Sequence, residues 1–285
     1  MAGALPDITL RQLEYLVAVA DAPTWSVAAE RVGVSASALS QGLAELERRV
    51  GVDLFESEGR RRVLRDAAAP VLDHARQVVA LTNDLVAWSD RLRSSRSGRV
   101  RIGMVDVAAV EHAPDVLRRF RAEHPDVDLM LSVAPSATLL ADLRSGALDL
   151  IVCVDPPEWP AGVDVEPLMV EPICVYAPRG TTFGPPATWG PWVVFPGDSH
   201  TRLQIMDRLR ELGAPVDVVA ESHQADVLRQ MVDLGLGWTV LPASAGDAGL
   251  ARGPKLFDRR LVLARRARSV HDPASDVLAD LLRHR

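Results

Sequence analysis

The chain has 285 residues, of which 48% are hydrophobic and 25% charged, and its net charge is −6 at pH 7. This length predicts two or three domains, and the composition is that of a globular protein able to bury a core. No apolar run approaches the ~20 residues of a membrane span, and the N-terminal segment lacks the basic flank and apolar stretch of a secretory signal. We therefore expect a cytoplasmic protein with no membrane partner.

The two cysteines, Cys153 and Cys174, lie inside apolar runs. This setting favours buried, reduced thiols, with a disulfide or a metal pair as the alternative.

Two helices are predicted at the start of the chain. Residues 8–22 carry apolar side chains at the spacing of one helix face. Thr9 and Gln12 have the spacing of a capping box, which predicts that the helix begins there. A second, shorter helix is predicted within residues 24–34, with Gly33 ending it.

A third helix is predicted over residues 35–50, with Ser35 as its N-cap and Gly51 as its stop. The turn at Gly33 joins the second and third helices as a helix-turn-helix, whose second helix contacts DNA. The candidate DNA-binding residues of this helix are Ser35, Ser37, Ser40 and Gln41.

Residues 53–64 predict a β-hairpin with an arginine-rich return strand, which is the wing of a winged helix-turn-helix. Cationic side chains on such a wing can meet DNA phosphates. The candidates are Arg60, Arg61, Arg62 and Arg65.

A long helix is predicted over residues 67–93, and residues 94–98 resemble a hinge. Apolar residues repeat every seven positions along this helix, which predicts a coiled-coil dimer helix. The alternative is a helix packed on its own domain. One seam consists of Val71, Val78, Leu85 and Leu92, and the second of His74, Leu81 and Trp88.

From residue 99 onward, short strands alternate with helices, which predicts a parallel sheet covered by helices. We expect two α/β lobes with a cleft between them. The first lobe is assigned residues 99–158 and 268–285, and the second residues 159–267.

The order of these elements resembles the LysR-type transcriptional regulator family. The segments that carry the resemblance are LRQLEYLVAVADAPTWSVAAERVGVSASALSQGLAELERRVGVDLFE, RVRIG, FRAEHPDVDLMLSV, LLADLRSGALDLIV and MVDLGLGWTVLP. The resemblance implies a winged helix-turn-helix (1–66), a dimerising linker helix and hinge (67–98), and a two-lobed domain similar to a periplasmic binding protein (99–285). It also implies binding of double-stranded DNA as a homodimer or homotetramer, controlled by a small-molecule effector in the cleft.

The sequence departs from the family in its DNA-reading segment. The family commonly has Gln at Ala36, Pro at Ser37, Arg at Ser57 and Thr at Arg65, so long donors are lost at Ala36 and Ser57. Gly42 costs the helix about 1 kcal/mol relative to alanine. We expect DNA binding with altered or relaxed specificity; the alternative is a small-molecule sensor with a degenerate DNA-reading head.

In a two-lobed α/β domain, ligands bind at the carboxyl ends of strands and beside helix N-termini. Four loops of this sequence meet this rule. Hydroxyl groups at helix starts, together with Arg202, suit an anionic effector. Asp106 instead suits an amine or a hydroxyl group on the effector. The candidate effector-binding residues are Asp106, Val107, Ser136, Thr138, Ser199, His200, Thr201, Arg202, Ser222 and His223.

Several of these residues have a structural alternative. Ser136 and Ser199 could be plain N-caps, and the histidines could be ordinary surface or core residues. No histidine or acidic residue has metal-binding spacing, and no cofactor is expected. An enzyme is not expected; a hydrolase using Ser199 with His271 and Asp272 is the remaining alternative.

Overall fold

A computed structural model describes residues 7–58, 61–94, 98–246, 249–267 and 273–284. Contacts divide the chain into two compact units, Met1–Asp90 with Arg144–Gly146, and Arg91–Leu143 with Ala147–Arg285. Within the described ranges, no helix has both the length and the apolar character needed to cross a bilayer.

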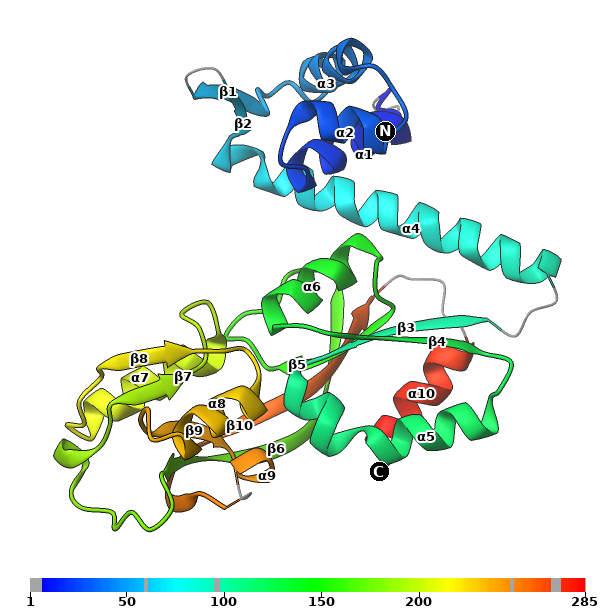
Figure 1. Cartoon of the computed structure of the whole chain (residues 1–285). Coiled ribbons are helices and arrows are strands. Elements are labelled where there is room, and N and C mark those ends of the chain that lie inside the picture. Colours follow the sequence, from blue (N-terminus) through cyan, green and yellow to red (C-terminus); the bar gives the residue numbers. More distant parts are fainter. Residues whose placement is uncertain (1–6, 59–60, 95–97, 247–248, 268–272, 285) are drawn as a thin grey trace, which may run out of the picture. The chain divides into compact units, whose positions relative to one another are not determined.

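The first unit begins with three helices, α1 (Leu10–Asp21), α2 (Trp25–Arg31) and α3 (Ala36–Val50) (Figure 1). The predicted capping box of α1 is confirmed: the Gln12 N–H donates to Thr9 Oγ1, and the Thr9 N–H donates to Gln12 Oε1. The Ser35 side chain caps α3, as expected, and Gly51 ends it in the left-handed conformation with φ 78°. Local capping chemistry therefore sets the bounds of these helices.

Gly42 allows α3 to pack closely on α1. A Cβ atom at this position would lie 2.7 Å from two ring atoms of Tyr15, which is too close for any other residue without movement. Tyr15 is itself buried in the core that joins the helices. Gly42 therefore has a packing reason, and it is not evidence of a degenerate DNA-reading head.

The wing follows as β1 (Phe55–Glu58) and β2 (Arg61–Leu64), which pair antiparallel (Figure 1). The ring of Phe55 packs edge-on against Trp25 of α2, with 5.1 Å between the ring centroids. This contact anchors the base of the hairpin to the helices.

A 3₁₀ turn (Asp66–Ala68) leads into α4 (Ala69–Ser94), with Pro70 in the first turn, where proline is tolerated. The first half of α4 packs on its own domain, because Leu72 and Ala75 are buried in the core of the three helices. Farther along, Leu85, Val86 and Trp88 are exposed. The first half of α4 therefore matches the alternative of a helix packed on its own domain, and the dimer helix stays a prediction.

The second unit contains a six-stranded mixed sheet of order β4-β3-β5-β10-β6-β9 and a separate parallel pair, β7-β8. The strands are β3 (Arg99–Met104), β4 (Asp128–Val133), β5 (Leu150–Val154), β6 (Val163–Ala177), β7 (Trp192–Val194), β8 (Val218–Glu221), β9 (Thr239–Pro242) and β10 (Ala251–Arg266). The helices are α5 (Pro114–Glu123), α6 (Ser136–Ser145), α7 (His200–Glu211), α8 (Ala225–Asp233), α9 (Ala243–Gly246) and α10 (Pro273–Arg283), with short turns at Ala108–His112 and Pro186–Thr188.

Two long antiparallel strands, β6 and β10, run side by side through both lobes (Figure 1). Lobe I here denotes β3, β4, β5, α5, α6 and α10, and lobe II denotes β7, β8, β9, α7, α8 and α9. The predicted division placed residues 159–267 entirely in the second lobe. In the structure, however, Leu168 of β6 and Leu261 of β10 pack in a core of lobe I, whereas Ile173 and Leu256 pack in the core of lobe II.

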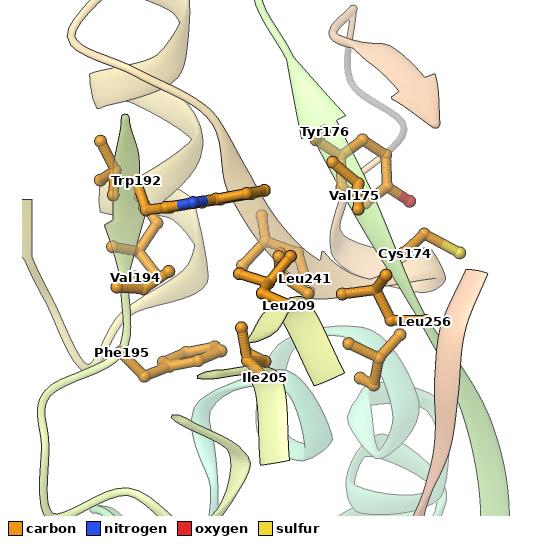
Figure 2. Packing of buried hydrophobic residues seen from close by; sticks show 14 of the residues in the cluster. Cys174, Val175, Tyr176, Trp192, Val194, Phe195, Ile205, Leu209, Leu241 and Leu256 are labelled. Carbon is orange, nitrogen blue, oxygen red and sulfur yellow. The ribbon is translucent and has the colours of Figure 1, made fainter. Parts of the chain in front are cut away.

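Each lobe has its own core. The lobe I sheet is covered on one face by Phe120 and Leu278 and on the other by Leu139 and Leu143. In lobe II, Figure 2 shows side chains of α7 lying between those of β7 and those of β6 and β10. Trp192 is fully buried there, and its indole N–H donates to the carbonyl of Pro215.

The predicted state of the cysteines is confirmed, because Cys153 in β5 and Cys174 in β6 are both buried and free.

Candidate functional site

A cavity of about 170 Å³ lies where the two lobes meet. It is lined by the loops that follow β3 and β4 and by those that precede α7 and α8. Seven of the ten predicted effector-binding residues line it: Asp106, Val107, Ser136, Ser199, His200, Thr201 and His223. The other three do not: Thr138 is exposed on α6, Ser222 accepts a hydrogen bond from the Gln224 N–H, and Arg202 has other partners.

Asp106 links the lobes across this cavity. Its Oδ2 accepts a hydrogen bond from the Ala225 N–H at 3.0 Å. Ala225 is the first residue of α8, and the residue before it, Gln224, supplies no side-chain cap. A carboxylate is favoured at a helix N-terminus by the free N–H groups and the helix dipole. Asp106 of lobe I therefore caps a helix of lobe II.

Ser136 does not cap α6, because it is already the first residue of that helix. Its Oγ instead accepts a hydrogen bond from the Val154 N–H at 3.3 Å, at the end of β5. The hydroxyl thus satisfies a strand end rather than a helix end, which is a correction to the structural alternative considered for it.

The N-terminus of α7 is left without a side-chain cap. Ser199 occupies the N-cap position, but its hydroxyl makes no capping hydrogen bond. The first helix-forming bond runs from the Leu203 N–H to the Ser199 carbonyl. Within the described part of the chain, the N–H groups of His200, Thr201 and Arg202 have no hydrogen-bond partner. These free donors lie where the helix dipole favours negative charge.

Arg202 does not line the cavity, contrary to its predicted role as the charged effector ligand. Its Nη1 donates to the Phe195 carbonyl at 2.6 Å and lies 3.2 Å from Glu221 Oε1. The guanidinium therefore ties α7 to the residue after β7 and to β8 within lobe II.

The arginine that does line the cavity is Arg259, which was not among the residues predicted from the sequence. Arg259 lies directly opposite Glu171 on the paired strands β10 and β6. Its Nε donates to Glu171 Oε1 at 2.5 Å, and its Nη1 donates to Thr201 Oγ1 at 3.3 Å. Its Nη2 is buried and has no hydrogen-bond partner.

His112 completes this buried cluster, with its Nε2 3.0 Å from Glu171 Oε2. Burial raises the pKa of Glu171, but the hydrogen bond with His112 and the charge of Arg259 outweigh it and hold that pKa below its usual value. Burial lowers the pKa of Arg259, and the Glu171 carboxylate opposes this change. The carboxylate is therefore ionised and pairs with a charged guanidinium at the junction of the lobes.

Among the described residues, no group of three or more His, Cys, Asp or Glu side chains could hold a metal ion. His271 and Asp272, the partners considered for a hydrolytic Ser199, lie outside the described residues.

The candidate DNA-reading face lies on the N-terminal half of α3. Ser37 and Gln41 are exposed, and Ser40 is half-buried. Ser35 Oγ accepts from the Ala38 N–H and lies 3.0 Å from Ser37 Oγ, so these two hydroxyls are partly occupied. Within the described residues, the Gln41 side chain has no hydrogen-bond partner. Gln41 is therefore the long polar side chain on this face that is free to contact a base.

The described wing arginines already have partners within the domain. Arg62 forms an ion pair with Glu47 at 3.3 Å, and its guanidinium lies 5.3 Å from the ring centroid of Trp25. Arg65 lies 3.4 Å from both Asp53 and Glu56. These contacts compete with the predicted phosphate contacts.

The remaining wing candidates are less well defined. Arg61 is the first residue of β2, and Arg60 lies outside the described residues.

Comparison with known families matches two models to this chain. Residues 10–69 match the bacterial regulatory helix-turn-helix protein, lysR family, and residues 93–285 match the LysR substrate binding domain. The chain belongs to the LysR family. It is a DNA-binding transcriptional regulator with an effector-binding domain.

Individual relatives span nearly the whole chain. A probable hydrogen peroxide-inducible genes activator of Streptomyces viridosporus is 30% identical over 292 residues, which cover 96% of this chain and 93% of that protein. The regulator CbbR of Rhodospirillum rubrum is 31% identical over 250 residues, covering 86% and 83%. A full-length OxyR variant from Pseudomonas aeruginosa has a TM-score of 0.65 at 26% identity, covering 96% of this chain and 94% of that one. Each of these three proteins therefore aligns with both the helix-turn-helix segment and the effector-binding domain of this chain.

Proposed function

We propose that this LysR regulator reads DNA through the exposed face of α3, with Gln41 as its principal base-contacting residue. The observation that carries this proposal is the exposed Gln41 side chain on a capped, well-packed helix. Ser37 and Ser40 flank it and can reach phosphates or base edges. A glutamine can bond an adenine through two hydrogen bonds, which suits a helix whose other exposed side chains are short.

In this proposal the wing contacts the phosphates of the DNA, mainly through Arg60 and Arg61. Arg62 and Arg65 contribute less, because each must give up or share a carboxylate partner to reach a phosphate. Ser35 acts on the fold, as the cap of α3, and only secondarily on DNA.

The effector occupies the cavity between the lobes. The residues proposed to contact it are Asp106, Val107, Ser136, Ser199, His200, Thr201 and His223, together with Arg259. Because Asp106 bridges the lobes across the same cavity, an effector there can change how firmly they are held together. The regulator acts in the cytoplasm in this proposal, and it pairs with a second copy through the exposed seam of α4 at Leu85 and Trp88.

The base-reading role of Gln41 can be tested by selection of preferred duplexes from a random DNA pool. We expect wild-type protein to select a defined site and Gln41→Ala to lose its preference at one adenine, by about 1–3 kcal/mol of discrimination. Gln204→Ala is the matched control, because Gln204 is also an exposed helical glutamine but lies on α7. A site selected identically by wild type and Gln41→Ala contradicts the assignment.

The competing function, a sensor with a degenerate DNA-reading head, gives a different outcome. In that case wild-type protein selects no site from the pool at all. The loss of long hydrogen-bond donors at Ala36 and Ser57 would then account for the missing sequence preference.

A further inference from the structure

Two helix N-termini, those of α7 and α8, face the cavity between the lobes, and they differ in one respect. The N-terminus of α8 is filled by the protein's own carboxylate, Asp106. The N-terminus of α7 has no side-chain cap, and the N–H groups of its first residues have no partner in the described part of the chain. The structure thus contains one occupied and one open position for a carboxylate.

The open position has a second donor beside it. Arg259 lines the same cavity, is 5% exposed, and leaves its Nη2 buried without a hydrogen-bond partner. Its Nη1 contacts Thr201, the second residue of α7, so the guanidinium lies next to the uncapped helix end. A buried guanidinium N–H without a partner is rare, because its desolvation is left uncompensated. An anion at this point would satisfy both groups.

We infer that the effector is a small monocarboxylate whose carboxylate bridges Arg259 Nη2 and the uncapped N-terminus of α7, with Ser199 Oγ as a further donor. This inference rests on the proposed effector site and adds the chemical class of its ligand.

The size and the lining of the cavity limit what the rest of the ligand can be. A volume of about 170 Å³ is close to that of an apolar cavity of ~150 Å³ that binds benzene. The ligand therefore has roughly seven non-hydrogen atoms. Apolar side chains form much of the wall, namely Val105, Val133, Val154 and Phe195. The ligand is a carboxylate with a compact aliphatic body.

The charges around the cavity favour a single negative charge. Glu171 already balances much of the charge of Arg259, and Asp106 and Asp198 also line the cavity. Arg259 is the single arginine or lysine among the described residues that line the cavity, so a dianion such as phosphate would meet these carboxylates with no second one to offset them. An amine would find Asp106 already bonded to Ala225, and it would face the positive end of α7.

Isothermal titration calorimetry on the full chain tests the inference with butyrate and 3-methylbutyrate as probes. Their neutral amides test the charge, hexanoate tests the size, and inorganic phosphate tests the other anion class. We expect saturable binding of butyrate or 3-methylbutyrate, with the amides, hexanoate and phosphate each at least about tenfold weaker.

The variants separate the site from the fold. Arg259→Lys keeps a cation beside Glu171 but loses the planar Nη2 donor, and Ser199→Ala removes one hydroxyl; both should weaken binding, Arg259→Lys by about tenfold or more. Ser222→Ala is the matched control, since Ser222 also precedes a helix but does not line the cavity. If Arg259→Lys does not fold, Arg259→Met with Glu171→Met removes both buried charges together and should abolish carboxylate binding.

The inference is overturned if no carboxylate binds saturably, if the amides or phosphate bind as tightly, or if the Arg259 variants retain full affinity. DNA affinity measured on the same preparations distinguishes this failure from a failure of the proposed regulator. Specific DNA binding without carboxylate binding overturns the ligand class alone.

Discussion

The carboxylate of Asp106 and the backbone N–H of Ala225 are joined by a 3.0 Å hydrogen bond, and this bond ties the loop after β3 to the first turn of α8. The two residues are 119 positions apart in sequence. One contact thus caps a helix and connects the lobes.

Asp106→Ala should lower the free energy of unfolding by about 1 kcal/mol, within the range typical of a lost N-cap. Asp106→Asn retains an oxygen that can accept from Ala225 and should stay close to wild type. Urea denaturation of both variants measures the difference. Equal stability of Asp106→Ala and wild type would show that the contact contributes nothing.

Glu171→Gln should cost about 3–5 kcal/mol, because it leaves the buried guanidinium of Arg259 without a counter-charge. Glu211→Gln is the matched control: Glu211 pairs with Arg208 but is 62% exposed, so its loss should cost less than about 1 kcal/mol. Chemical denaturation at neutral pH compares the two. Similar losses in both variants would contradict a special role for the buried pair.

The same carboxylate gives a pH dependence. The pKa of Glu171 is lower in the folded protein than its ordinary value of about 4.3, so its ionisation stabilises the fold above that pH. This contribution is lost as the pH falls through the folded-state pKa. Wild-type stability should therefore decrease more steeply below about pH 4.3 than that of Glu171→Gln. If urea denaturation shows that the stability of wild type and that of Glu171→Gln fall equally steeply below about pH 4.3, the lowered pKa of Glu171 is contradicted.

Gly42→Ala should destabilise the DNA-binding unit, although alanine favours a helix by about 1 kcal/mol. The added methyl group would lie 2.7 Å from the Tyr15 ring, and overpacking typically costs 1–3 kcal/mol. Thermal unfolding checks the sign. Tyr15→Leu in the Gly42→Ala background should recover part of the loss, whereas a rise in melting temperature for Gly42→Ala alone would contradict the packing argument.

Cys153 should react slowly with thiol reagents in the native protein. Burial raises its pKa to about 12, so the thiolate is scarce near neutral pH. Iodoacetamide labelling of a Cys174→Ser variant, followed by mass spectrometry, isolates Cys153. Labelling should be far faster in urea than in buffer at pH 8. Comparable rates in the two conditions would show an accessible, activated thiol.

Local signals predicted the helices well and the long strands poorly. The capping box at Thr9 and Gln12 and the cap at Ser35 are chemistry between near neighbours, which a sequence displays directly. By contrast, only short strands are predicted from residue 99 onward, whereas β6 spans Val163–Ala177 and β10 spans Ala251–Arg266. The structure accommodates Pro254 at an irregularity in the register between β10 and β6.

The effector site shows the same division. Loops after strands could be identified from sequence, and seven predicted residues do line one cavity. The arginine that lines the cavity could not be identified, because Arg202 stands beside a predicted helix start whereas Arg259 reaches the cavity only through the pairing of β10 with β6. The signal that the sequence offers for Arg259 is the arginine pair Arg259-Arg260 directly before the apolar run over residues 261–264.

Fluorescence anisotropy with a duplex from upstream of its own coding region, beside a scrambled duplex, tests the central claim most directly. The account predicts clearly tighter binding of the native duplex, with affinity for both duplexes falling as salt rises. Equal binding of the two duplexes at every salt concentration would contradict a working DNA-reading helix.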